Sequence, residues 1–116
     1  MTTTPHMVLG LLASGQTSPE VPHNEAILKL DMLTSCSVAD RDLTSPPAAV
    51  DGDRYLVAAA ATGDWSGLDG MIVMYWSGQW ITHTPKTGQI VYVEDEHKLI
   101  CWVEATTTWY DFATLY

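Results

Sequence analysis

Residues 62–80 read TGDWSGLDGMIVMYWSGQW and contain three tryptophans, two aspartates and four glycines around a short apolar run. Glycine reaches backbone angles closed to other residues, and aspartate side chains hydrogen-bond to nearby backbone, so the first half predicts tight turns. The second half places apolar residues on either side of Ser77-Gly78, which is typical of a β-hairpin. We therefore expect paired strands over 71–76 and 79–84.

The sequence on either side of this stretch extends the pattern of short strands. The segment SPPAAVDGDR at 45–54 is a break, because Pro46 and Pro47 cannot continue a helix and Asp51-Gly52 is typical of a turn. A charged tip at 94–98 separates two apolar runs, which predicts a second hairpin. The further strands expected from these patterns span residues 55–61, 89–93, 99–103 and 109–115.

One segment, HNEAILKLDMLTSCSVA at 23–39, has helical spacing of its apolar residues. We expect Asn24 to cap this helix and Glu25 to favour the positive end of the helix dipole. Leu28 and Met32 are apolar but lie off the main stripe, so the helix has more apolar surface than one contact needs. A second burying partner, such as another subunit, would account for it. The main stripe contains Ala26, Ile27, Leu30, Leu33 and Ser37.

The first 22 residues contain three prolines and many serines and threonines, which predicts an extended arm that lies on a neighbouring surface or stays mobile. The fold class that follows is α+β, with this arm, one helix, and then a small antiparallel sheet or barrel of five to six strands. We expect two parts: a docking arm over 1–22 and a single helix-plus-antiparallel-sheet domain over 23–116.

Charge and composition exclude two classes of partner. The chain has 116 residues, a net charge of −9 and only five Lys plus Arg, which disfavours contact with nucleic acid phosphates. No window approaches the ~18 apolar residues of a membrane span, so we expect no membrane insertion. The two cysteines, Cys36 and Cys101, are interpreted as free thiols made in a reducing compartment, with a bridge between them as the alternative.

The tryptophans leave three hypotheses open: a core, a subunit interface or a sugar-stacking surface. With a two-residue turn, Tyr75 opposes Trp80 on one face of the hairpin and Trp76 lies on the other, so aromatic residues occupy both faces. Trp65 lies in a Gly- and Asp-rich loop between Asp64 and Asp69, where an exposed ring could stack on a sugar while carboxylates accept its hydroxyls. It could equally plug the end of a small barrel.

Catalysis and metal binding have little support in the sequence. Carboxylate pairs such as Glu94 with Glu96 lie at a polar hairpin tip, where solvated charges are the rule, and no residue pattern selects a glycosidase pair. The four histidines are dispersed, and the Asp spacing does not match an EF-hand loop. We expect no enzyme activity, no catalytic residue, no metal and no cofactor.

The order of motifs along the chain resembles a known family. ASGQ (13–16), HNEAILKLDML (23–33), LTSPPAAVDGDRYLVAAAATGDWSGLDGMI (43–72), SGQW and VEDE follow one another as in a domain of unknown function from tailed phages and gene-transfer agents. That domain occurs in tail-fibre and head-spike proteins. The resemblance covers roughly residues 8–103 and is most specific in the DGDRYLV and ATGDWSG segments. PEVPHNE and the tail after Val103 depart from the family pattern.

The resemblance implies a virion structural protein that is made in the cytoplasm of a bacterial host. It implies a short fibre or spike, or a connector, that supports host attachment and forms homo-oligomers, commonly trimers, with no receptor-binding domain following. The implied partners are other virion proteins: capsid, baseplate or fibre. The alternative is a carbohydrate-binding module that contacts host surface glycans through loop aromatics.

Three sets of residues are predicted to carry these roles. The expected oligomer interface consists of Ala26, Ile27, Leu30, Leu33, Trp76 and Trp80. The expected docking contacts in the arm are Pro5, Met7, Val8, Leu9, Leu11 and Leu12. The candidate glycan contacts are Trp65, Asp64 and Asp69.

Overall fold

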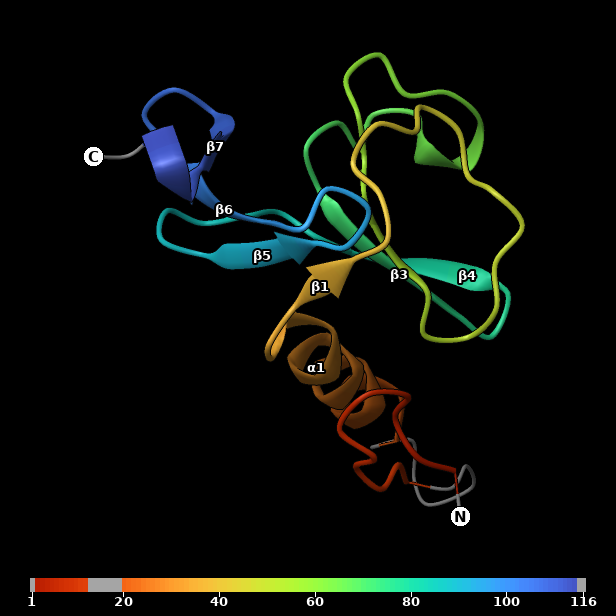
Figure 1. Ribbon diagram of the computed structural model, residues 1–116. Helices are drawn as coiled ribbons and strands as arrows, with labels where there is room; N and C mark the ends of the chain where they lie inside the picture. The colour runs from red at the N-terminus through yellow and green to blue at the C-terminus, as the bar shows by residue number, and fades with distance from the viewer. Residues whose placement is uncertain (1, 13–19, 115–116) are drawn as a thin grey trace. The chain divides into compact units, whose positions relative to one another are not determined.

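The computed structural model describes residues 2–12 and 20–114 of the chain, which form two compact units, Met1–Thr34 and Ser35–Tyr116 (Figure 1). Residues 13–19 of the predicted arm and the end of the last predicted strand lie outside the described residues. The predicted division into an extended docking arm over 1–22 and a single helix-plus-antiparallel-sheet domain over 23–116 stays a prediction.

In the N-terminal unit the arm doubles back on itself beside its own helix, α1 (Glu20–Leu33). The Thr4 N–H donates to the Leu9 carbonyl at 2.8 Å, and the Leu11 N–H donates to the Thr2 carbonyl at 2.9 Å. The carboxylate of Asp31, which is fully buried, accepts the backbone N–H groups of His6 and Met7. A residue of the helix therefore fixes the turn of the arm.

The helix begins and ends earlier than the predicted range of 23–39. Pro22 is tolerated because it lies in the first turn, where N–H groups have no intrahelical acceptor. The predicted cap at Asn24 is wrong: this residue lies inside α1, and its amide exchanges hydrogen bonds with the backbone of Leu12 at 2.9 and 3.0 Å. The helix ends before Ser35, whose φ is 46°.

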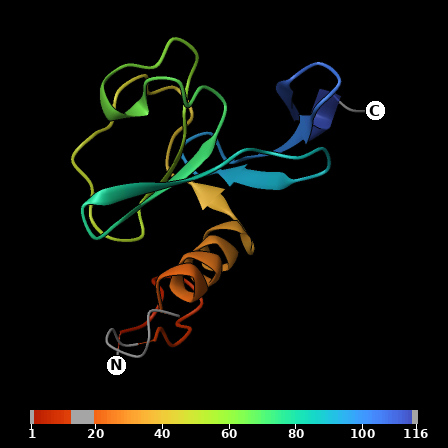
Figure 2. The same cartoon turned by 180° about the vertical axis from the view of Figure 1, so that it is seen from behind.

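The described residues of the C-terminal unit form seven strands in two sheets. Figures 1 and 2 show the course of the chain through these strands. One sheet has the order β1-β5-β6-β7, in which β1 is parallel to β5 and the other neighbours are antiparallel. The other sheet, β2-β3-β4, is antiparallel throughout. The strands are β1 (Ser37–Val38), β2 (Arg54–Leu56), β3 (Ile72–Trp76), β4 (Gln79–His83), β5 (Ile90–Val93), β6 (Lys98–Val103) and β7 (Thr108–Asp111).

The predicted α+β class is confirmed, with the strands divided between two small sheets and no closed barrel among the described residues. The strand expected over 55–61 is shorter, because Ala60 has a φ of 62° and the chain turns there. The last expected strand ends at Asp111, where the one-turn helix η2 (Phe112–Thr114) begins. No described helix is long and apolar enough to cross a membrane.

The two sheets are linked by the backbone immediately after β1. The Ala39 N–H donates to the Arg54 carbonyl at 2.9 Å, and the Leu56 N–H donates to the Asp40 carbonyl at 3.1 Å. The chain leaving β1 thus runs beside β2. Residues 39–40 thereby place the charged groups that follow them at the junction of the sheets.

The hairpin predicted around Ser77-Gly78 is confirmed, with Tyr75 opposite Trp80 and Trp76 opposite Gln79. Ser77 and Gly78 both have positive φ, 48° and 80°, as the twist of a two-residue hairpin turn requires. The side chain of Asp51 accepts the Ser77 N–H at 2.8 Å, so the DGD turn supports the hairpin turn.

The core beside the three-stranded sheet is centred on Val57, Trp65 and Val73. The loop after β2 forms the one-turn helix η1 (Gly63–Trp65), and Trp65 is fully buried. Its ring centroid lies 5.2 Å from that of Trp80 and 5.7 Å from that of Tyr55. The partly buried residues that surround this centre are Leu43, Tyr55, Ala61, Leu68 and Trp80.

Candidate functional site

The candidate glycan residues do not form a sugar platform in this structure. The expectation of an exposed Trp65 is wrong, because η1 places its ring in the core, where it presents no face to a ligand. Asp69 instead holds its own loop, accepting the N–H groups of Ala60 at 3.0 Å and Ala61 at 3.1 Å. Asp64 is exposed.

The predicted interface residues lie in both compact units. On α1, Leu30 is 51% exposed and Ala26 is exposed, whereas Leu28 and Met32, placed off the main stripe, are buried. Ile27 and Leu33 are half-buried. In the hairpin, Trp76 and Trp80 are half-buried, and the ring of Trp80 packs against the core. The interface role of these six residues stays a prediction.

The predicted docking arm has its most exposed apolar residues at the tip of its turn. Met7 is 41% exposed and Val8 is 67% exposed. Val8 also has a φ of 56°, a left-handed conformation that β-branched residues rarely adopt. Leu12 is exposed, whereas Pro5, Leu9 and Leu11 are half-buried. Docking through this arm stays a prediction.

The outer face of strands β5 and β6 carries a group of exposed apolar side chains that the sequence analysis did not single out. Tyr92 lies opposite Leu99, and Ile90 lies opposite Cys101. Ile90 is 49% exposed, Leu99 44% and Tyr92 36%. Tyr110 of β7, opposite Cys101, continues the same row. We call these five residues the apolar face.

The sequence shows that β5 and β6 are apolar, but it does not show which side of these strands is exposed to solvent. IVYV and LICWV are apolar at every position, so alternation cannot separate a buried row from an exposed one. The opposite side of the same strands contains Val91, Val93 and Ile100, which are fully buried. Only the packed structure distinguishes the two rows.

The two cysteines are free, so the bridge between them is not formed. Burial raises the pKa of Cys36 to about 11, with a smaller opposing effect from the charge of Arg54. Cys36 is therefore a neutral thiol at physiological pH. Cys101 lies half-buried on the apolar face.

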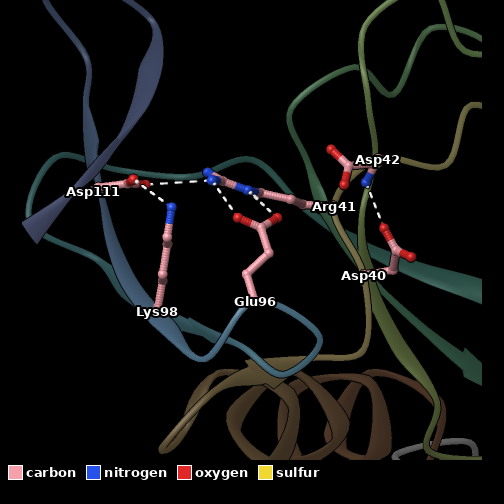
Figure 3. A network of polar contacts seen from close by, with 6 residues as sticks. All are labelled: Asp40, Arg41, Asp42, Glu96, Lys98 and Asp111. Atoms are coloured by element: carbon pink, nitrogen blue, oxygen red, sulfur yellow. Dashed lines mark hydrogen bonds and ion pairs between the residues drawn. The ribbon is translucent and has the colours of Figure 1, made fainter.

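A network of charged groups ties the chain after β1 to the tip of the β5–β6 hairpin and to β7 (Figure 3). Arg41 donates two hydrogen bonds to the Glu96 carboxylate, at 2.8 and 2.7 Å, and a third to Asp111 at 3.3 Å. Lys98 lies 3.3 Å from the second oxygen of Asp111. The bond from Arg41 lowers the pKa of Glu96 and raises that of Arg41 itself.

Three carboxylates gather beside this network. One ligand atom from each of Asp40, Asp42 and Asp95 lies within 4.8 Å of the other two. Reduced hydration of Asp95, with repulsion from Asp40, raises the pKa of Asp95. Such oxygens suit a hard cation such as Ca²⁺. Exposed acidic groups commonly gather without an ion, however, so we assign no metal here.

Comparison with known proteins identifies a family. A family model described as a protein of unknown function (DUF2793) matches residues 23–110, from α1 to the end of the four-stranded sheet. No curated protein matches the chain. No solved structure matches it.

Proposed function

The chain belongs to the DUF2793 family of proteins of unknown function, and from that premise we propose that it is a virion structural protein of a tailed phage or phage-like particle. It acts as a short fibre, spike or connector that assembles through hydrophobic interfaces and supports host attachment. The sequence resemblance to tail-fibre and head-spike proteins supports the assignment to a phage or phage-like particle. The apolar face supports the assembly.

The apolar face is the observation that carries the proposal. Single exposed apolar residues are normal on protein surfaces, but a contiguous apolar patch marks an interaction surface. Here Ile90, Tyr92 and Leu99 lie together on two paired strands, in a chain whose net charge is −9. Burial of this face between protein chains removes apolar area from water and adds no unpaired charge.

The partner that we propose for this face is another copy of the chain. A stable interface buries about 800 Å² on each partner, which is more than five side chains supply. Further contact area is therefore needed from other exposed surface of the C-terminal unit. The family resemblance favours three copies. The tip of the arm, Met7 and Val8, would then dock on a capsid, baseplate or fibre protein.

The first test measures the mass of the purified chain in solution by light scattering. We expect an oligomer, and we expect Ile90→Lys/Leu99→Lys to convert it to a monomer with an unchanged circular dichroism spectrum. The control variant Ser45→Lys/Ala105→Lys adds the same charge at two exposed loop positions and should stay oligomeric. A monomeric wild type, or an oligomeric Ile90→Lys/Leu99→Lys variant, contradicts the proposal.

The second test concerns the particle. Mass spectrometry of purified particles from the bacterium that produces the chain should detect it as a component. Val8→Lys should reduce its incorporation while leaving the solution oligomer intact, whereas Thr2→Lys, at another exposed position of the arm, should not. Particles that lack the chain contradict the virion assignment. Normal incorporation of Val8→Lys contradicts docking through the arm.

A further inference from the structure

A groove of about 560 Å³ opens at the junction of the two sheets of the C-terminal unit. On one side it is lined by the end of β2 and by residues 57–59, and on the other by Trp102 of β6 and Trp109 of β7. Arg41, Asp42, Asp69, Gly70 and Thr107 complete the lining. This volume is in the range of small-molecule sites, which combine an apolar wall with a few polar groups.

The two tryptophans form a fixed aromatic wall. They lie opposite each other on β6 and β7, with ring centroids 5.3 Å apart and an interplanar angle of 60°. The Trp109 indole N–H donates to the Gly70 carbonyl at 3.0 Å. Gly70 has a φ of 77°, and a Cβ there would lie 3.8 Å from the Trp102 ring. The backbone at Gly70 therefore fixes the Trp109 ring, and the Trp102 ring lies close to it.

One polar atom in this wall is unpaired. The Nε1–H of Trp102 is buried and has no acceptor among the described residues. A buried donor without an acceptor is unfavourable, and native proteins usually satisfy it with protein, water or ligand. Because this N–H has almost no solvent-accessible surface, we do not count it as a contact for a ligand in the groove.

The charges around the groove narrow the ligand class further. The Arg41 guanidinium is already engaged by Glu96 and Asp111, so it offers little free positive charge. Asp69 uses both oxygens to hold the N–H groups of Ala60 and Ala61. Asp42 is exposed at the rim, where its carboxylate can accept hydroxyl groups. The carboxylates of Asp42 and Asp69, together with the net charge of −9, disfavour binding of anionic ligands.

We propose that this groove binds a neutral oligosaccharide. The C–H face of a sugar ring packs on Trp102 and Trp109, while hydroxyl groups donate to the carboxylate of Asp42. The site differs from the one expected around Trp65, whose ring is buried. It does not depend on the chain being a virion protein.

The test uses four trisaccharides as probes: cellotriose, maltotriose, triacetylchitotriose and the anionic trigalacturonate. Binding to the full chain is followed by tryptophan fluorescence and by saturation-transfer NMR at up to about 10 mM of each sugar. We expect at least one neutral probe to bind with a millimolar Kd or tighter, and trigalacturonate to bind at least about tenfold more weakly. Absence of binding by all three neutral probes, or equal binding of trigalacturonate, overturns the proposal.

Two variants locate the binding in the groove. Ala59→Phe places a bulky side chain on the groove lining and should weaken binding at least about tenfold, whereas Ala48→Phe, at an exposed alanine outside the lining, should change it less than about twofold. Asp42→Ala removes the rim acceptor without adding bulk and should also weaken binding. Unfolding curves confirm that each variant is folded. Wild-type affinity in both Ala59→Phe and Asp42→Ala overturns the site.

Discussion

Trp65 is fully buried beside the three-stranded sheet, whereas Ile90, Tyr92 and Leu99 on the four-stranded sheet expose between about a third and a half of their surface. Both regions are rich in large apolar side chains, so composition does not distinguish them. The two regions differ in what packs on them. The 57–68 loop packs on β2, β3 and β4, whereas no segment packs on the apolar face within the described part of its unit. Apolar residues of the first region stabilise the fold, and those of the second are available for association.

The largest expected effect tests this contrast directly. Trp65→Ala leaves a cavity in the core and should lower the free energy of unfolding by about 3–5 kcal/mol, measured by chemical denaturation. Tyr92→Ala, in protein dilute enough to be monomeric, should lower it by less than about 1 kcal/mol because the side chain is already partly in water. Equal losses in the two variants would remove the distinction between the regions.

A smaller effect is expected from the loop that covers the core. Asp69→Ala removes the acceptor of two backbone N–H groups, those of Ala60 and Ala61, and should cost about 1–2 kcal/mol of unfolding free energy. The matched variant Asp64→Ala changes an exposed carboxylate in the same loop and should cost less than about 0.5 kcal/mol. Urea denaturation measures both. A larger loss for Asp64→Ala would show that the loop is held differently.

The smallest expected effect concerns the ionic contacts of the four-stranded sheet. The hydrogen bond from Arg41 lowers the pKa of Glu96 below its ordinary value of 4.5, so the pair stabilises the fold above that pH. This contribution is lost as the pH falls below 4.5 and through the lowered folded-state pKa. Because the pair is near the surface, we expect less than about 1 kcal/mol, reduced further by salt.

Glu96→Gln isolates this contribution. Denaturation midpoints measured between neutral pH and pH 3 should fall less steeply for this variant than for the wild type. The control variant Glu104→Gln, at an exposed turn position, should follow the wild type. Identical pH profiles for Glu96→Gln and the wild type would mean that the Arg41–Glu96 contact contributes nothing measurable to stability.

Local sequence signals predict the parts of this fold that depend on neighbouring residues. The α+β class and the Ser77-Gly78 hairpin follow from turn chemistry and apolar periodicity. The apolar spacing of the helix does not identify its buried side, where Leu28 and Met32 are buried together with Asp31. The carboxylate of Asp31 is tolerated there because it accepts backbone N–H groups of the arm. A polar residue on the buried face cannot be inferred from hydrophobic spacing.

The candidate sites depend on contacts that periodicity does not encode. A tryptophan in a Gly- and Asp-rich loop suggests exposure, yet η1 places Trp65 in the core. The groove joins Trp102 and Trp109 to Gly70 and to residues 57–59, which are distant in the sequence. The short parallel pairing of β1 with β5 is also nonlocal and carries no sequence signature of its own.

That parallel pairing has a consequence for how the protein is made. Ser37 and Val38 pair with Tyr92 and Val93, so β2, β3 and β4 are all synthesised between the two partners. During translation, β1 leaves the ribosome long before β5 exists, so the burial of Val38 seen in the finished protein is completed only after residues 92–93 have been made. The three-stranded sheet, built from residues 54–83, has all its strands earlier. The order of synthesis therefore favours completion of the tryptophan core before the four-stranded sheet closes.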